Sequence, residues 1–310
     1  MSLPSSTQRF FVRFGLFSLP VLILLGILEY QQFILPNNYQ AKETYLRQIQ
    51  DTVEIIALGN SQTYMGVNPW VMPRPAFNLS NTAQTLTYDF ELLQAYHKQL
   101  PALRYVILGI STPSLYSIGH ELPGDFNRIY HYKHYLGIDA EAKPWKARYY
   151  SITNTISIKK SVDRMIDYYT GQDDLIEFDS LGWYTDSVQR DLTQNGLDAA
   201  ASHMKYVKWE HKAYNLKQLD KLISLCKQNG YTLIIYSPPM YHTYQSNLHP
   251  TYYQDMVQTL DSVSSAQSIA YLDFTYDRTY QAEDYFDSNH LRESGSLKLS
   301  NSLASLIHSP

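Results

Sequence analysis

The sequence predicts an α/β protein in which helices cover both faces of a parallel β-sheet, a three-layer α/β/α sandwich, with a membrane-spanning helix in front of it. Three observations predict this: short apolar runs, helical patterns that alternate with those runs, and a long apolar stretch near the N-terminus. Nearly continuous apolar runs are typical of strands that are buried on both faces of a parallel sheet. The chain has 310 residues, which is enough for one large α/β domain or two small ones.

The N-terminal stretch is expected to cross a lipid bilayer. Residues from Phe14 to Leu28 carry no charge, and a spanning helix needs about 20 residues, fewer when flanking side chains reach the headgroups. Arg9 and Arg13 precede the stretch without an acidic residue, so the positive-inside rule places the N-terminus in the cytoplasm and the chain after residue 35 outside. A cleaved signal peptide and a buried soluble helix are the alternatives. No Ala-x-Ala-like cleavage pattern follows Leu28, and the two arginines disfavour a buried helix.

The remaining elements follow in order along the chain. We expect an anchor over residues 1–35, a polar stalk with a short helix over 36–52, and an α/β domain over 53–310. Apolar runs predict strands, and apolar residues at helical spacing predict helices. The expected strands are 53–58, 76–79, 104–110, 231–237 and 270–274, the last in the chain; the expected helices are 85–100, 214–228, which Asn229-Gly230 ends, and 296–307.

The stretch from about 115 to 212 fits the alternating pattern poorly. It is rich in tyrosine and histidine, and we interpret it as a partly helical insertion that covers the functional site of the α/β domain. The whole chain has 28 tyrosines, which suits surfaces that bind sugars or polymers but also half-buried core positions.

In a parallel sheet, a site lies beyond the carboxyl ends of the strands. Polar residues follow four of the expected strands and should therefore share one rim. They are Gly59-Asn60-Ser61, Ser80-Asn81, Ser111-Thr112 and Ser237-Pro238. Taken alone, Ser61 is weak evidence for a nucleophile, because serine is common in turns.

A second group of polar residues lies near the C-terminus. Asp287 and His290 are three residues apart, so both side chains can meet on one tight turn that leads into a helix. The carboxylate can then hold the ring Nδ1–H and leave Nε2 free to take a proton from a hydroxyl, as a nucleophilic serine requires. The alternative is a helix cap with a surface histidine.

The order of these segments resembles that of the SGNH (GDSL-like) hydrolases and acyltransferases. Two of the family's blocks match: Gly59-Asn60-Ser61 after the first strand, and Asp287-Ser288-Asn289-His290 before the last helix. The resemblance implies a flavodoxin-like fold over 53–310, with Ser61 as nucleophile, His290 as general base and acid, and Asp287 as the partner that orients the ring. It implies neither a cofactor nor a metal.

The other two blocks of that family are altered here. The second block normally offers a glycine N–H to the oxyanion, and Ser80-Asn81 stands in that place. The third normally offers an asparagine side chain, whereas this chain has Ser111-Thr112-Pro113. Loss of one oxyanion donor typically costs about two to three orders of magnitude in rate. The backbone N–H of Ser61 stays available, and the candidate oxyanion or substrate-binding residues are Asn60, Ser80, Asn81 and Ser111.

The pattern is most similar to the membrane-anchored branch of the family, which also has Asn-Leu, Pro-Pro and His-Leu pairs, here Asn78-Leu79, Pro238-Pro239 and His290-Leu291. That branch works outside the cell beside a multi-spanning membrane-bound O-acyltransferase, on teichoic acids or exported polysaccharides. The resemblance implies an acyltransferase that acts on such a glycan. An esterase, in which water accepts the acyl group, and a non-catalytic subunit that presents glycan are the alternatives.

Composition and short motifs disfavour several other functions. The net charge is -4 and no basic block occurs, so nucleic acid is not an expected partner. The single cysteine, Cys226, cannot form an internal disulfide. His131 and His134 have the spacing of two zinc ligands but lack a third. Asn78-Leu79-Ser80 fits a glycosylation sequon but falls where a strand should meet the site, and no glycine-rich phosphate loop is present.

Overall fold

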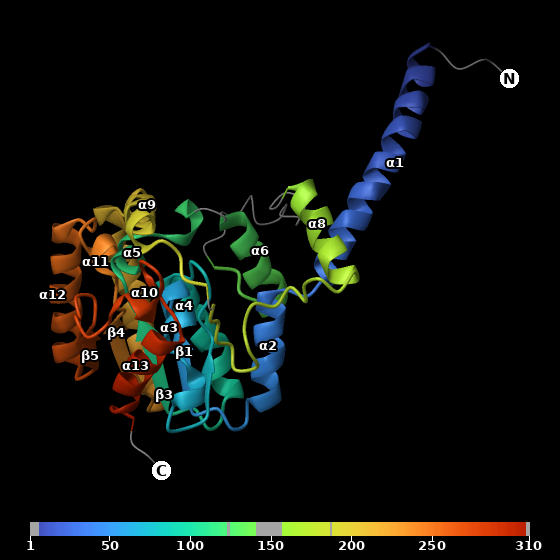
Figure 1. Cartoon of the computed structure of the whole chain (residues 1–310). Helices are drawn as coiled ribbons and strands as arrows, with labels where there is room; N and C mark the ends of the chain where they lie inside the picture. The colour runs from blue at the N-terminus through green and yellow to red at the C-terminus, as the bar shows by residue number, and fades with distance from the viewer. Residues whose placement is uncertain (1–5, 123–124, 141–156, 187, 308–310) are drawn as a thin grey trace.

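The computed structural model describes residues 6–122, 125–140, 157–186 and 188–307. In Figure 1 a long helix, α1 (Ser6–Ile34), projects away from the body of the protein and carries the N-terminus far from it. The sheet lies inside the body with helices packed around it, and the C-terminus emerges at the opposite end of the body.

The centre of the protein is a five-stranded sheet in which all paired strands are parallel. The strand order is β2-β1-β3-β4-β5. Ile56 of β1 pairs with Phe77 of β2 and with Val106 of β3, which fixes the register at the centre. The expected α/β fold with a parallel sheet is thereby confirmed. The strands are β1 (Ile55–Leu58), β2 (Ala76–Asn78), β3 (Tyr105–Gly109), β4 (Thr232–Ser237) and β5 (Ala270–Asp273).

Strand residues alternate between two hydrophobic clusters, one on each face of the sheet. Ile56 and Leu58 lie in a cluster with residues of α4 (Leu86–Tyr96), α10 (Lys212–Asn229) and α12 (Pro250–Gln267). Ile55 and Ala57 lie in the other cluster with Leu299 and Leu303 of α13 (Glu293–Ala304). Because both faces are buried, the strands carry the continuous apolar runs that the sequence displays.

Several expected elements are present with slightly different ends. The helix expected over 214–228 is α10, and Gly230 ends it in the left-handed region with φ 72°. The helix expected over 85–100 is α4 followed by a 3-10 turn, η2 (His97–Gln99). The expectation that 270–274 is the last strand is wrong, because β6 (Tyr285–Asp287) and β7 (His290–Leu291) form an antiparallel pair after it. Such short strands leave no apolar run to detect.

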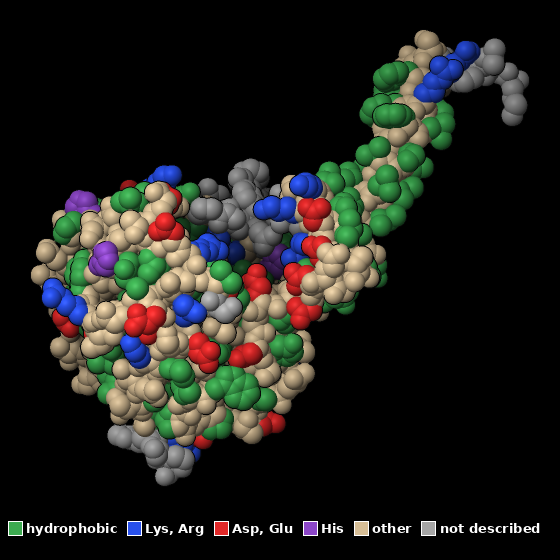
Figure 2. All heavy atoms as spheres, in the orientation of Figure 1, with side chains coloured by type: hydrophobic (Ala, Val, Ile, Leu, Met, Phe, Trp, Pro, Cys, Tyr) green, Lys and Arg blue, Asp and Glu red, His purple; other side chains and the backbone are tan. Residues whose placement is uncertain are grey.

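α1 (Ser6–Ile34) is, within the described part of the chain, the one helix long and apolar enough to cross a membrane. Its large side chains are exposed, as Phe17 at 77% illustrates. Figure 2 shows hydrophobic side chains along its projecting length and basic side chains toward its far end. A helix with an apolar surface on all sides suits a hydrocarbon environment better than water.

The segment that follows α1, expected as a stalk, contains α2 (Asn38–Ile49). Leu46 of α2 is 1% exposed and belongs to the same cluster as Ile56. Lys42 Nζ donates hydrogen bonds to the backbone carbonyls of Asn78 and Ser80. α2 thus packs against the loop that follows β2.

Helices also occur in the described parts of residues 115–212. α8 (Ile158–Tyr169) packs against the end of α1, where the side-chain amide of Gln32 donates to the Ser161 carbonyl at 2.9 Å. α9 (Leu192–Met204) contacts α11 (His242–Gln245) and the β6 strand. The elements not yet given are α3 (Ser61–Gly66), η1 (Pro69–Val71), α5 (Thr112–Tyr116), η3 (Gly119–Glu121), α6 (Asp125–Leu136), η4 (Trp209–His211) and η5 (Ala282–Asp284).

Candidate active site

The candidate site lies at the carboxyl ends of β1 and β3. From β1 the chain crosses outward to β2 and then returns past β1 to β3, so the strand order reverses between β1 and β3. In open α/β sheets the crevice at such a reversal is the usual ligand site. Ser61 lies three positions after the end of β1, and Ser111 lies two positions after the end of β3.

A tight glycine turn carries Ser61 from β1 into α3. Gly59 has φ 136°, a conformation that other residues rarely adopt. A Cβ at this position would lie 2.4 Å from Thr63 Oγ1 and 3.0 Å from the carbonyl oxygen of Gly109. The Thr63 oxygen is itself held by the Tyr236 hydroxyl at 3.0 Å. Glycine is therefore required at the turn that presents Ser61.

Asn60 caps α3 beside the serine. Its Oδ1 accepts the backbone N–H of Gln62 at 2.9 Å, which satisfies one of the free amides at the helix start. Its Nδ2 donates to the hydroxyls of Ser111 and Ser114, each at 3.2 Å. The side chain of Asn60 thus ties the end of β1 to the end of β3.

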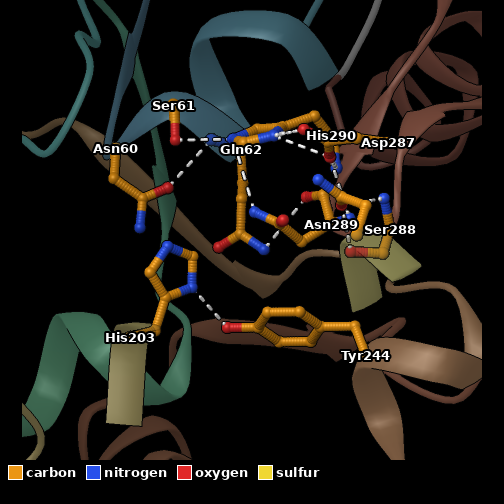
Figure 3. A network of polar contacts seen from close by, with 10 residues as sticks. Asn60, Ser61, Gln62, His203, Tyr244, Asp287, Ser288, Asn289 and His290 are labelled. Atoms are coloured by element: carbon orange, nitrogen blue, oxygen red, sulfur yellow. Dashed lines mark hydrogen bonds and ion pairs between the residues drawn. The ribbon is translucent and has the colours of Figure 1, made fainter. Parts of the chain in front are cut away.

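Ser61, His290 and Asp287 form one continuous chain of hydrogen bonds (Figure 3). His290 Nε2 lies 2.7 Å from Ser61 Oγ, although 229 positions separate the two residues. His290 Nδ1 lies 2.9 Å and 3.0 Å from the two carboxylate oxygens of Asp287. The amide Nδ2 of Asn289 approaches the same Nε2 at 3.4 Å, so the groups around Nε2 are donors.

The turn between β6 and β7 holds the acid and the base in this arrangement. Asp287 Oδ1 accepts the backbone amides of Asn289 and His290 at 3.0 Å and 2.9 Å. Gln62, from the helix that begins with Ser61, donates to the Asn289 carbonyl at 3.2 Å. On the other side, Asn195 Oδ1 accepts the Ser288 hydroxyl at 2.6 Å. The turn is thus joined both to α3 and to α9.

The charge state of Asp287 suits the orientation of the ring. Its side chain is 8% exposed and that of His290 is 17% exposed. Burial alone would raise the pKa of Asp287, but the charge of His290 and the hydrogen bonds from its ring and from two backbone amides outweigh it and lower that pKa below the usual value. The carboxylate stays ionised at neutral pH, accepts Nδ1–H, and leaves the Nε2 lone pair for the Ser61 hydroxyl.

The expected oxyanion groups near Ser61 are occupied by other partners. The Ser80 N–H donates to Asn78 Oδ1 at 3.1 Å, and the Asn81 N–H donates to the Gly59 carbonyl at 3.3 Å. The Ser111 hydroxyl lies within the Asn60–Ser114 network and is 1% exposed. Both amide hydrogens of Asn60 also have partners. Ser61 brings its own backbone N–H, at the start of α3, where helical amides have no partner within the helix.

A cavity of about 360 Å³ opens beside these residues, large enough for a sugar ring or an acyl group. Ser61, His290 and Asp287 line it, and so do residues of the 115–212 stretch. Those from that stretch include Glu177, Tyr184, Arg190 and His203. Sequence spacing carried no signal for them or for Asn195, because each reaches the site from a distant part of the chain. Gln62 directly follows Ser61, but its bond to the Asn289 carbonyl joins two segments that are far apart in the sequence.

Neither comparison with known proteins nor a metal-binding group among the described residues identifies this site, so its geometry has to carry the interpretation. The chain matches no protein-family model and no curated protein. Over residues 6–122, 125–140, 157–186 and 188–307, no group of three or more His, Cys, Asp or Glu side chains could hold a metal ion. The rings of His131 and His134 pack against Tyr39 and Tyr130, with centroids 4.9 Å and 4.2 Å apart.

Proposed function

We propose that this protein is a membrane-anchored serine acyltransferase of the SGNH type, which acts outside the cytoplasm on a cell-surface or exported glycan. One observation carries the proposal: the hydrogen bonds that link Asp287, His290 and Ser61 at the carboxyl ends of a parallel sheet. A nucleophile, a base within hydrogen-bond reach and a group that orients the base are the parts that acyl transfer requires.

The fold supports the same assignment. The strand order 2-1-3-4-5 is that of flavodoxin-like sheets, and helices pack on both faces, which favours the three-layer sandwich. The strand–Gly-Asn-Ser–helix at one end and the Asp-x-x-His turn before the last helix support the SGNH resemblance.

The first half of the reaction forms an acyl-enzyme. Ser61 Oγ attacks the acyl carbonyl carbon of an ester or thioester while His290 Nε2 takes the hydroxyl proton. The bond from the acyl carbon to the leaving group then breaks, and His290 gives its proton to the leaving group. Asp287 holds the ring and stabilises the imidazolium that forms between the two proton transfers.

The second half reverses these roles. An acceptor hydroxyl loses its proton to His290 and attacks the acyl carbonyl of Ser61. The bond to Ser61 Oγ breaks, and the serine regains the proton from His290. When the acceptor is a sugar hydroxyl the protein is a transferase; when it is water the protein is an esterase. Tyr184 and Phe286 in the cavity wall offer the aromatic surface on which a sugar ring can pack.

The anchor accounts for the source of the acyl group. A domain outside the cytoplasm has no direct access to cytoplasmic thioesters, so an acyl group has to reach it through the membrane. A multi-spanning membrane-bound O-acyltransferase beside α1 would supply it. The basic N-terminus and the apolar, exposed surface of α1 support a single-pass arrangement with residues after 35 outside.

A second candidate function follows from the occupied amides of Ser80 and Asn81. If the site lacks the donors that stabilise an oxyanion, the domain serves as a non-catalytic subunit that presents glycan to a partner. This candidate predicts that Ser61→Ala leaves glycan modification unchanged in cells.

Trapping of the nucleophile tests the proposal. The full-length protein in lipid nanodiscs is treated with a fluorophosphonate and digested, and the labelled peptide is identified by mass spectrometry. We expect the label on Ser61, its loss in Ser61→Ala, and its retention in Ser114→Ala, a serine that lines the same cavity. An unlabelled wild-type protein, or normal glycan acylation in cells that carry Ser61→Ala, would exclude the enzymatic role.

A further inference from the structure

His203 is a second imidazole in the cavity, outside the hydrogen-bonded chain of Ser61, His290 and Asp287. It lies near the end of α9, and its Nδ1 is 2.7 Å from the hydroxyl of Tyr244 on α11. Figure 3 shows the other ring nitrogen, Nε2, on the side of the ring that faces Asn60 and Ser61. Both His203 and Ser61 line the cavity.

The Tyr244 hydroxyl determines which nitrogen of His203 carries the proton. Tyr244 is 1% exposed, and His203 Nδ1 is the only hydrogen-bond partner of its hydroxyl among the described residues. A buried hydroxyl hydrogen without an acceptor is strongly unfavourable, so the phenol donates and Nδ1 accepts. In a neutral ring the hydrogen must then sit on Nε2, where it faces the cavity as a donor.

The ring stays neutral in the working pH range. Burial, followed by the nearby charge of His290, lowers the pKa of His203 to about 4, against a smaller opposing effect of Asp287. Burial also raises the pKa of Tyr244 far above its usual value, so the phenol keeps its proton. A neutral imidazole that donates through one nitrogen can polarise a carbonyl without competing as a base.

Acyl transfer at Ser61 needs such a donor. The tetrahedral intermediate places a negative charge on the former carbonyl oxygen, and donors aimed at that oxygen supply much of the catalysis. The Ser80 N–H, the Asn81 N–H and the Asn60 amide all have partners elsewhere. The backbone N–H of Ser61 therefore needs a second donor, and the Nε2–H of His203 enters the same cavity.

We propose that His203 donates its Nε2–H to the carbonyl oxygen of the acyl group that Ser61 attacks, and that Tyr244 is the positioning residue that holds the ring in this tautomer. The proposal rests on the proposed acyl transfer at Ser61. In the SGNH resemblance, an asparagine of the third block donates to the oxyanion, and this chain has no asparagine there. The proposal assigns that donor role to His203.

The test compares rates of fluorophosphonate labelling of Ser61 in the full-length protein in nanodiscs. His203→Phe should slow labelling by about 10²- to 10³-fold, as loss of one oxyanion donor does. His203→Gln, whose amide can still donate, should recover part of the rate. Tyr244→Phe should slow labelling less than His203→Phe, because the ring remains but its tautomer is no longer held.

A second measurement reads the tautomer without relying on activity. In protein labelled with ¹⁵N-histidine, the ring nitrogens of His203, assigned by comparison with His203→Gln, should show protonated Nε2 and bare Nδ1 at pH 7. Tyr244→Phe should shift this pattern toward a mixture of the two tautomers.

The outcomes separate this proposal from the proposed function. If Ser61 is labelled in the wild type and equally fast, within threefold, in His203→Phe, the role of His203 is excluded while the acyl-enzyme stands. A ring of His203 that carries its proton on Nδ1 at pH 7 also excludes it. If Ser61 of the wild type takes no label, both proposals fail together.

Discussion

Asp287→Asn is the substitution that most directly tests the proposed chain of proton transfer. The asparagine has nearly the same shape, so it changes which atoms donate and accept without opening a cavity. In the wild type, Asp287 Oδ1 accepts two backbone amides at 2.9 Å and 3.0 Å, and both carboxylate oxygens face His290 Nδ1. The orientation of the new amide is determined by these neighbours.

The asparagine oxygen has to face the two backbone amides, because an NH₂ group there would meet two donors. That oxygen then uses one lone pair for each amide, and the new NH₂ group takes the position that lies 3.0 Å from His290 Nδ1. Nδ1 becomes an acceptor, so the ring proton moves to Nε2. His290 then presents N–H to the Ser61 hydroxyl and cannot take its proton.

We expect a loss of about 10⁴-fold in the rate of Ser61 labelling, as found when a catalytic histidine is forced into the wrong tautomer. At 1.36 kcal/mol for each factor of ten, this corresponds to about 5 kcal/mol of barrier. The measurement is the rate of fluorophosphonate labelling of the full-length protein, with a melting curve to show that the variant is folded.

Asp284→Asn is the matched control. It makes the same chemical change three residues earlier, where the carboxylate pairs with Lys298 and accepts the Gln281 backbone amide, away from His290. It should lower the melting temperature and leave the labelling rate within about threefold of the wild type. If Asp287→Asn labels Ser61 within tenfold of the wild-type rate, His290 does not act through the tautomer that Asp287 fixes, and the assigned roles are refuted.

Three further predictions follow from the fold and the anchor. Gly59→Ala should destabilise the protein by about 1–3 kcal/mol, because the residue has φ 136° and its Cβ would lie 2.4 Å from Thr63 Oγ1. Urea unfolding measures this loss, and an unchanged midpoint would contradict the requirement for glycine at this turn. Burial raises the pKa of Asp89 to about 7, and hydrogen bonds from Gln84 and the Gly59 amide oppose this effect only in part. The contribution of this carboxyl to the free energy of unfolding therefore falls as pH rises from about 4 to 7, by up to roughly 4 kcal/mol. Relative to the wild type, Asp89→Asn should therefore gain stability across that range, as melting temperatures at pH 4.5 and 8 would show, whereas a parallel pH profile in both proteins would refute the buried acid. In a Cys226→Ala background, a membrane-impermeant maleimide on intact cells should label Asp198→Cys and not Ser6→Cys, and the reverse pattern would overturn the orientation of the anchor.

Strong local signals account for what the sequence by itself determined. β1, β3 and β4 are buried on both faces, so each appears as a continuous apolar run, and Asn229-Gly230 supplies the left-handed residue that ends α10. The Asp-x-x-His spacing of residues 287 and 290 is also local, and the two side chains meet on one turn. α12 escaped prediction because only Met256, Leu260 and Ser264 of its 18 residues are buried, which leaves too narrow an apolar stripe.

Only the tertiary structure decided which residues at the rim of the sheet are joined by hydrogen bonds. Hydrogen bonds from Gln62 to residue 289 and from Ser288 to Asn195 join segments 227 and 93 positions apart, and the Ser80 and Asn81 amides are used up inside the fold. His203 reaches the cavity from α9, and the sequence pattern of this helix does not predict that one of its residues lines a site. Spacing reports contacts between residues that are near in sequence, whereas the direction of a donor in a cavity depends on how distant elements pack against one another.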